Sequence, residues 1–146
     1  MKSRCNAAFT LVEVLIVIVI MAILAAVIVP NFVDTTKDAR ESTALFNLHT
    51  LRSQIQVYCA EHTGELPGPL LEELAEETDE EGNVSPGGPY GPYCAQIPVN
   101  PFSNSALVNE IANSPAQESD VSASHGWLYN PTTGEIWISH EDYYGE

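Results

Sequence analysis

The feature that most constrains this chain is an apolar run over residues 9–29, in which Thr10 and Glu13 are the only residues that are not apolar. As a helix with about 1.5 Å of rise per residue, the run would be about 31 Å long, which matches the hydrocarbon thickness of a bilayer. An ionised carboxylate at the centre of a bilayer costs about 3 kcal/mol. A plain membrane anchor gains nothing from this cost, so Glu13 suggests a carboxylate that meets a cation on a neighbouring subunit.

The residues around this acid form a recognisable pattern. The chain opens with the leader MKSRCNAA (residues 1–8), and FTLVEVLIVIVIMAILAAVIVPNF follows directly. This segment resembles the class III signal segment of type IV pilins and of the pseudopilins of type II secretion systems. In that family the leader is cut before a Phe, a Glu lies four residues after it, and a Pro interrupts the apolar run near its end. Phe9, Glu13 and Pro30 match these positions, whereas Ala8 stands where the family normally has Gly.

The resemblance implies a set of roles and partners. A prepilin peptidase would cut between Ala8 and Phe9, and the new amine of Phe9 would be methylated. Glu13 and Pro30 would act in assembly, where Glu13 of one subunit pairs with the Phe9 amine of the next. The subunits would form a homopolymer through their N-terminal helices. An external assembly ATPase and a membrane platform protein would drive this step, so the chain itself needs no nucleotide site.

The charge is distributed very unevenly along the chain. The formal net charge is −15, and all five Lys and Arg lie in the first 52 residues. Residues 53–146 contain no Lys or Arg and sixteen Asp and Glu. Such a surface repels phosphate backbones, which argues against nucleic-acid binding by this part of the chain. A solubilising acidic surface is the simplest interpretation, and cation binding is the alternative.

The basic residues also indicate an orientation in the membrane. Lys2 and Arg4 precede the apolar run, so the positive-inside rule places the amino terminus in the cytoplasm. We therefore predict a single-pass protein of the cytoplasmic (inner) membrane with its head outside. The assembled filament would be periplasmic or extracellular.

Beyond Pro30 the pattern predicts that the helix continues to residue 62. Apolar residues recur there every three or four positions, as on one face of a helix, and Gly64 provides a stop. Pro30 removes one backbone hydrogen bond and should kink the helix; the alternative is that it marks the end of the transmembrane span. The predicted buried stripe consists of Ala44, Leu48, Leu51, Ile55, Tyr58 and His62.

The residues after the helix predict a small head. Residues 69–77 predict a short helix with its leucines facing inward, and residues 104–124 predict a polar, mobile loop. The clearest strand signal is WLYNPTTGEIWIS at 127–139, where two β-rich runs flank turn residues and so predict a hairpin. A hairpin alone is marginal in water, so its apolar face should cover the helix stripe.

Together these patterns predict an α+β fold, with a long N-terminal helix, transmembrane and then amphipathic, packed on a small antiparallel β-sheet head. The expected organisation is a basic leader at 1–8, a transmembrane helix at 9–29 and an amphipathic continuation at 30–62. An acidic globular head with a C-terminal hairpin would follow at 63–146.

The cysteines predict a disulfide. Cys5 would leave with the leader, so the mature chain would keep Cys59 and Cys94. An even pair in an exported head indicates one bond, which would close a loop of about 35 residues and contribute about 3–4 kcal/mol. Two separate buried thiols are the alternative.

Residues that could carry catalysis or hold a metal give no matching pattern. The chain has no GxxxxGK, GxSxG or CxxC motif, and its four His lack metal-ligand spacing. We therefore predict a protein that is not an enzyme and has no cofactor, with calcium as the alternative. The major pseudopilins commonly hold calcium in a C-terminal loop, which the acidic clusters here do not match residue by residue. The candidate ligands are Asp79, Glu80, Glu81, Glu118 and Asp120.

The sequence supports one function above the others. We interpret the chain as a structural subunit of a pilin-like filament, a major-pseudopilin-like component of a type II secretion system that acts in protein export. A type IV pilus subunit for adhesion, motility or DNA uptake is the first alternative. The second is a non-polymerising, membrane-anchored periplasmic binding module, and the third is a secreted domain with an ordinary signal peptide cut near Ala25 or Ala26.

Overall fold

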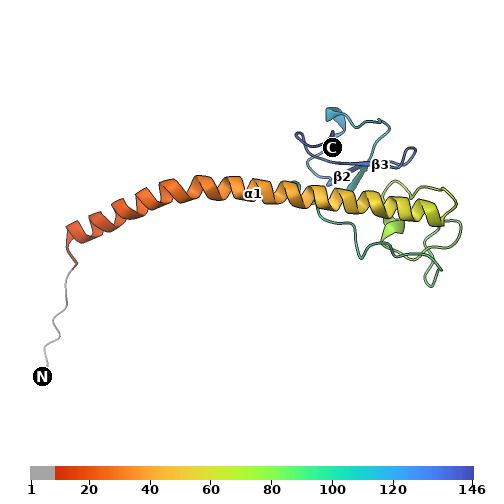
Figure 1. The fold of residues 1–146 in the computed structure, drawn as a ribbon, viewed down its shortest axis with the longest axis horizontal. Coiled ribbons are helices and arrows are strands. Elements are labelled where there is room, and N and C mark those ends of the chain that lie inside the picture. The colour runs from red at the N-terminus through yellow and green to blue at the C-terminus, as the bar shows by residue number, and fades with distance from the viewer. Residues whose placement is uncertain (1–8) are drawn as a thin grey trace, which may run out of the picture. The chain divides into compact units, whose positions relative to one another are not determined.

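The computed structural model describes residues 9–146, with the backbone alone for residues 29–34. Its elements are one long helix, three short strands and two short 3-10 helices (Figure 1). The chain divides into two compact units, Met1–Ala39 and Arg40–Glu146. In chain order the elements are α1 (Leu11–Glu61), η1 (Glu72–Leu74), β1 (Val108–Glu110), η2 (Glu118–Asp120), β2 (Trp127–Asn130) and β3 (Glu135–Ile138).

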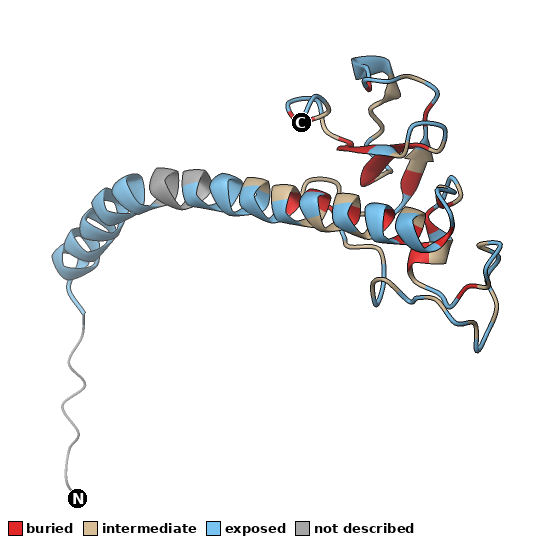
Figure 2. Cartoon of the chain, turned by 45° about the vertical axis from the view of Figure 1, so that its right-hand side comes forward, coloured by how far each residue is buried: buried red, intermediate tan, exposed pale blue. Residues whose placement is uncertain are grey.

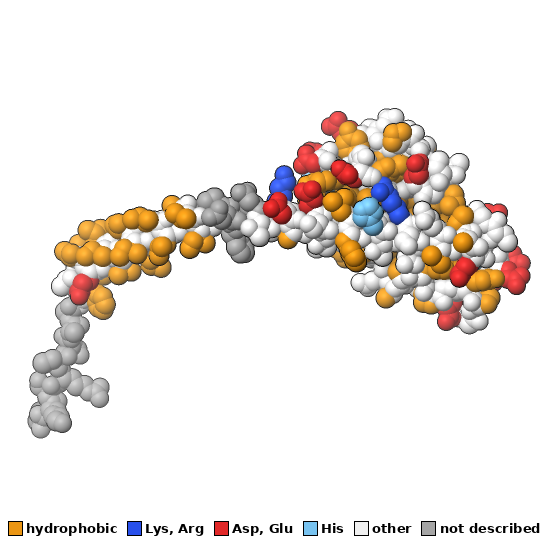
Figure 3. All heavy atoms as spheres, in the orientation of Figure 1, with side chains coloured by type: hydrophobic (Ala, Val, Ile, Leu, Met, Phe, Trp, Pro, Cys, Tyr) orange, Lys and Arg blue, Asp and Glu red, His pale blue; other side chains and the backbone are white. Residues whose placement is uncertain are grey.

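The N-terminal unit contains the apolar part of α1. Leu11–Ile28 has a mean hydropathy of 3.3, and none of it is buried within the chain. Figures 2 and 3 show these turns as exposed and covered by hydrophobic side chains. By length and composition, this stretch could cross a membrane, since every backbone hydrogen bond is made within the helix and the side chains suit lipid.

The helix does not end at Pro30. The backbone of α1 stays helical through this residue and continues to Glu61. The alternative that Pro30 marks the end of the transmembrane span is compatible with this result, because a helix can continue beyond the membrane. The predicted kink stays a prediction, because the surroundings of the Pro30 side chain lie outside the described residues.

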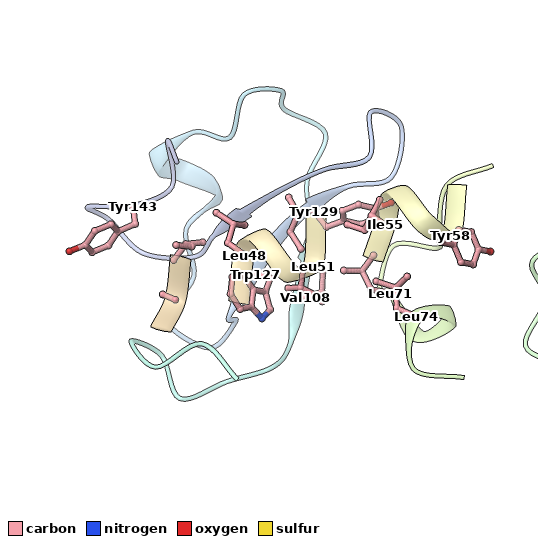
Figure 4. Packing of buried hydrophobic residues seen from close by; sticks show 13 residues of the cluster. Leu48, Leu51, Ile55, Tyr58, Leu71, Leu74, Val108, Trp127, Tyr129 and Tyr143 are labelled. Atoms are coloured by element: carbon pink, nitrogen blue, oxygen red, sulfur yellow. The ribbon is translucent and has the colours of Figure 1, made fainter. Parts of the chain in front are cut away.

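The head unit is organised around the stripe on α1. Leu48 and Leu51 are fully buried, and Figure 4 shows them beside Trp127 of β2. Their spacing of three and four residues puts these side chains on one face of the helix, as predicted. Burying each such side chain contributes about 1.5–3 kcal/mol, so this face fixes α1 to the sheet. The core cluster is Ala44, Leu48, Leu51, Ile55, Tyr58, Leu71, Leu74, Val108, Trp127, Tyr129, Ile136, Ile138 and Tyr143.

The predicted hairpin is confirmed, and its turn explains the register. β2 and β3 pair antiparallel, with Trp127 opposite Ile138 and Tyr129 opposite Ile136. Asn130 Oδ1 accepts the N–H of Thr132 at 2.9 Å inside the turn. Gly134 closes the turn with φ of 75°, a backbone conformation that glycine adopts without strain.

The sheet differs from the prediction in one respect. The strand β1 pairs with β2 in parallel, which makes a mixed three-strand sheet with order β1-β2-β3. It lies in the polar segment 104–124, which was predicted to be a mobile loop. The long connection through η2 brings the chain back to the end of the sheet from which β1 started, and a strand entered in this way runs parallel to its neighbour. The α+β class stands, with antiparallel pairing limited to the hairpin.

The short helix predicted at 69–77 is smaller than expected. Only Glu72–Leu74 is helical, as one 3-10 turn, because Leu71 has a left-handed backbone with φ of 58°. Leu71 and Leu74 are fully buried as predicted, but Leu70 is 54% exposed. One helical turn presents fewer residues to the core than the predicted helix of nine.

Candidate functional site

The site that the sequence singled out begins one residue before α1. Thr10 precedes the first helical residue, and Glu13 lies in the first turn. The backbone N–H of Thr10 donates to Glu13 Oε2 at 2.8 Å, and its hydroxyl donates to the same oxygen at 2.7 Å. In return, the backbone N–H of Glu13 donates to Thr10 Oγ1 at 3.2 Å. This reciprocal arrangement is a capping box, which satisfies backbone donors that a helix start leaves free.

The capping box changes the interpretation of Glu13. The sequence suggested a carboxylate that needs a cation from a neighbour, but the structure gives it local donors first. A negative charge in the first turn also interacts favourably with the helix dipole. Within the described residues, the hydrogen bonds to this carboxylate all fall on Oε2, which leaves Oε1 for a further partner. The sequence analysis missed Thr10, although its spacing of three residues from Glu13 is the signature of this cap.

Phe9 lies directly before the cap, and its side chain is 80% exposed. Ala8, on the other side of the predicted cleavage point, lies outside the described residues. The structure therefore places the residue that would carry the new amine next to the capped carboxylate, and it leaves the predicted cleavage between Ala8 and Phe9 as a prediction.

Comparison with known proteins places this segment in a family. Residues 3–29 match the family model described as the prokaryotic N-terminal methylation motif. The type II secretion system core protein G of Klebsiella michiganensis is 28% identical over 105 residues, which cover 70% of this chain and 72% of that protein. The protein of the same description from Aeromonas hydrophila is 36% identical over 58 residues. The N-terminal segment of this chain is therefore similar to that of pilins and pseudopilins.

The matches at higher identity cover a smaller part of this chain. The match to the Aeromonas protein covers 40% of this chain and 41% of that protein. The match to core protein G of Dickeya chrysanthemi is 36% identical and covers 38% of this chain and 37% of that protein. The chain thus spans about two fifths of the length of these two relatives. No solved structure matches it significantly.

The predicted disulfide is not formed, and both thiols are free. Cys59 borders a cavity of about 510 Å³ beside the turn of the hairpin, where Thr133 and Trp137 also contribute to the wall. Cys94 instead lies against η1, where its thiol donates to the carbonyl oxygen of Leu74 at 3.4 Å. Burial raises the pKa of the Cys94 thiol. The structure thus shows the two thiols in separate surroundings, and an even cysteine count alone gives no information on which face of the helix each thiol occupies.

The acidic clusters considered for calcium are used in turns. Asp79 Oδ1 accepts the backbone N–H of Glu81 at 3.1 Å and that of Asn83 at 2.9 Å. These bonds, chiefly the one from Asn83, lower the pKa of the Asp79 carboxyl. Asp120 accepts the side-chain amide of Asn113 at 2.9 Å. Its carboxylate also accepts the backbone N–H of Gln117, the N-cap residue of η2. Glu80 and Glu118 are exposed beside these turns.

Across residues 9–146, no three His, Cys, Asp or Glu side chains come together in a way that could hold a metal ion. The carboxylates of the two clusters therefore have a structural use that the sequence did not reveal. The hydrogen bonds of Asp79 and Asp120 explain why acids stand at these positions.

His62 forms a hydrogen-bonded junction at the end of α1. Its side chain is fully buried, with Nδ1 2.9 Å from the carbonyl oxygen of Tyr58 and Nε2 3.0 Å from both Thr78 Oγ1 and the carbonyl oxygen of Asp79. Its ring stacks on that of Tyr58, with ring centres 4.0 Å apart. This junction joins the end of α1 to the loop after η1. The sequence assigned His62 to the buried stripe, but its polar partners could not be inferred from spacing.

Proposed function

We propose that this chain is a subunit of a type II secretion pseudopilus, the filament that acts in protein export. The observation that carries the proposal is the capped acid at the start of an apolar helix within the methylation motif. The similarity to type II secretion system core protein G supports secretion over a pilus for adhesion, motility or DNA uptake. The pilin and pseudopilin family consists of structural subunits, so the protein has a structural role rather than an enzymatic one.

The first step is processing at the membrane. A prepilin peptidase cuts between Ala8 and Phe9, and the amine of Phe9 is then methylated. The helix start is already ordered at this point, because the hydrogen bonds between Thr10 and Glu13 do not involve the leader. The positive-inside rule, applied to the basic leader, orients the subunit with its head outside the cytoplasmic membrane.

Assembly then pairs charges between subunits. The amine of Phe9 in one subunit meets Glu13 of its neighbour, so that each charge offsets the cost of removing the other from water. Because Oε2 is held by Thr10, the geometry leaves Oε1 for the incoming amine. Packing of the apolar helices holds the shaft, and small residues at Ala22, Ala25 and Ala26 allow close approach. An assembly ATPase and a membrane platform protein supply the work.

No cofactor forms part of this proposal. Of the five carboxylates first considered for calcium, Asp79 and Asp120 already accept N–H donors of nearby residues. The acidic head also repels nucleic acid, so the filament acts on protein cargo rather than on DNA.

The experiment that tests the proposal has two parts. Edman or mass-spectrometric sequencing of the mature protein should begin at a methylated Phe9. Deletion of the gene should abolish export of the cargo, and the wild-type gene should restore it. A mature start at Val27 would instead indicate a secreted domain, and an intact Met1 would indicate a simple anchor. Normal export from the deletion strain would contradict the proposed role.

A further inference from the structure

The head carries an extreme charge that any assembly must accommodate. All but three of the twenty Asp and Glu (Glu13, Asp34 and Asp38) lie within residues 40–146, against two cations, Arg40 and Arg52. Figure 3 shows acidic side chains at many places on the visible face of this unit. Two copies that approach through such surfaces repel each other. A contact between heads therefore needs a cation at the point of closest approach.

One of the two cations is already in use. Arg52 is half-buried, and one nitrogen of its guanidinium donates to the carbonyl oxygen of Ile136 at 3.0 Å and to a backbone oxygen of Glu146. It fixes β3 and the last residues to α1. Arg40, by contrast, is exposed, and no carboxylate of the described residues forms an ion pair with it. Arg40 is therefore the cation of this unit that is available to another molecule.

A groove beside η1 has apolar and acidic lining residues, which complement a basic side chain such as that of Arg40. Its volume is about 490 Å³, and its apolar wall includes Leu70 and Val84, which are 54% and 49% exposed. Two acids, Glu72 and Glu76, stand at its edge and are exposed. The remaining lining residues are Ala75 and Ile97. An apolar channel between two carboxylates suits a side chain with an aliphatic stem and a planar cationic head.

Two other acids of the head are engaged by tyrosine hydroxyls. Glu41 accepts the hydroxyl of Tyr143 at 2.8 Å, and Glu61 accepts the hydroxyl of Tyr93 at 2.8 Å. No hydrogen bond to the carboxylate of Glu72 or Glu76 is made by the described residues. The acids at the groove are thus free to bind an external cation.

We propose that Arg40 of one subunit docks into this groove on a second copy of the chain. The stem of Arg40 lies along Leu70 and Val84, and its guanidinium binds the carboxylates of Glu72 and Glu76 in charge-assisted hydrogen bonds. The contact neutralises acids where two heads meet. This inference rests on the proposed polymerisation, because it names the head surface through which neighbouring subunits join.

A charge exchange in the full-length protein tests this pairing. Arg40→Glu and Glu76→Arg are made separately and together, and polymers are collected by sedimentation beside a membrane fraction that reports monomers. Each single variant should lower polymer yield by about tenfold or more, the usual scale for losing one well-formed ion pair at an interface. The double variant should restore much of the yield, because the pair is rebuilt with its charges exchanged. Glu80→Arg is the matched control, since Glu80 is an exposed acid outside the groove.

Each outcome has a defined meaning. Normal polymers from both single variants would overturn the inference, and so would a loss that the double variant does not restore. If Glu76→Arg blocked export of cargo but left homopolymers intact, the groove would serve a different protein and the inference would be wrong. Failure of the proposed function is visible separately, because all variants, including the wild type, would then form no polymer.

Discussion

The junction at His62 gives a stability prediction that can be worked from the structure. In His62→Leu the buried hydroxyl of Thr78 loses the ring nitrogen that lies 3.0 Å from it, whereas the carbonyl oxygen of Asp79 keeps the backbone N–H of Gly82 at 3.1 Å. A buried polar group without a partner costs about 1–3 kcal/mol, and the lost ring stack on Tyr58 adds about 0.5–1.5 kcal/mol. The leucine recovers part of this by apolar burial, which leaves a net loss of about 1–2 kcal/mol.

The assay is thermal unfolding of the full-length protein in detergent, followed by near-ultraviolet circular dichroism of the aromatic residues. For a unit of this size, the expected loss lowers Tm by about 5–10 °C. Thr78→Val provides the second arm of a double-mutant cycle. Because the double variant His62→Leu/Thr78→Val leaves no orphaned hydroxyl, its destabilisation should be smaller than the sum by about 1 kcal/mol. Strictly additive losses, or an unchanged Tm for His62→Leu, would refute the reasoning.

Four further results are expected. Glu13→Gln should keep membrane insertion and leader cleavage but reduce polymer yield, because it keeps the hydrogen bonds from Thr10 and loses the charge. If Glu13→Gln and the wild type gave equal polymer yields, the hydrogen-bonding geometry of this side chain would be enough for assembly, and the charge would not be needed. Mass spectrometry after maleimide labelling without reductant should find both Cys59 and Cys94 modified, and a disulfide-linked peptide pair would contradict the structure. Since hydrogen bonds lower the pKa of Asp79, its carboxylate stabilises the fold above the unfolded pKa of about 4, and this contribution is lost as pH falls through the lower folded value. Stability profiles of Asp79→Asn should therefore be flatter than those of the wild type below about pH 4. Arg52→Met should lower the free energy of unfolding in urea by about 1–2 kcal/mol, because two backbone oxygens lose a charged donor. An unchanged urea midpoint would show that β3 and the C-terminal residues are held by packing alone.

The parts of the fold that follow from local periodicity could be predicted from the sequence. The buried face of α1 repeats every three or four residues, so Leu48, Leu51 and Ile55 were identified without knowledge of their partners. The hairpin was predictable because its turn residues, including Gly134, are specific to short connections.

Features that depend on distant segments could not be predicted in this way. The strand β1 is three residues long and polar in sequence, and it becomes a strand through its pairing with β2. The thiols of Cys59 and Cys94 are assigned to separate surroundings by the packing of the head. The capping partner of Glu13, Thr10, could have been predicted from the spacing of three residues between them. The sequence pattern instead suggested a partner on a second subunit.

The core packs residues from the beginning of the head against residues from its end. This long sequence separation affects when the core can form during synthesis. Leu48 and Leu51 on α1 are covered by Trp127, Tyr129 and Ile136, which lie about eighty residues later in the chain. Contacts between such distant positions form slowly, because a long loop must close before they contribute. If the head crosses the membrane as proposed, the helix stripe stays uncovered until the final hairpin has emerged. A prematurely terminated chain therefore keeps exposed apolar surface and stays unfolded, and cellular proteases remove such chains. In the proposed pseudopilus, only complete subunits would then survive to enter the filament.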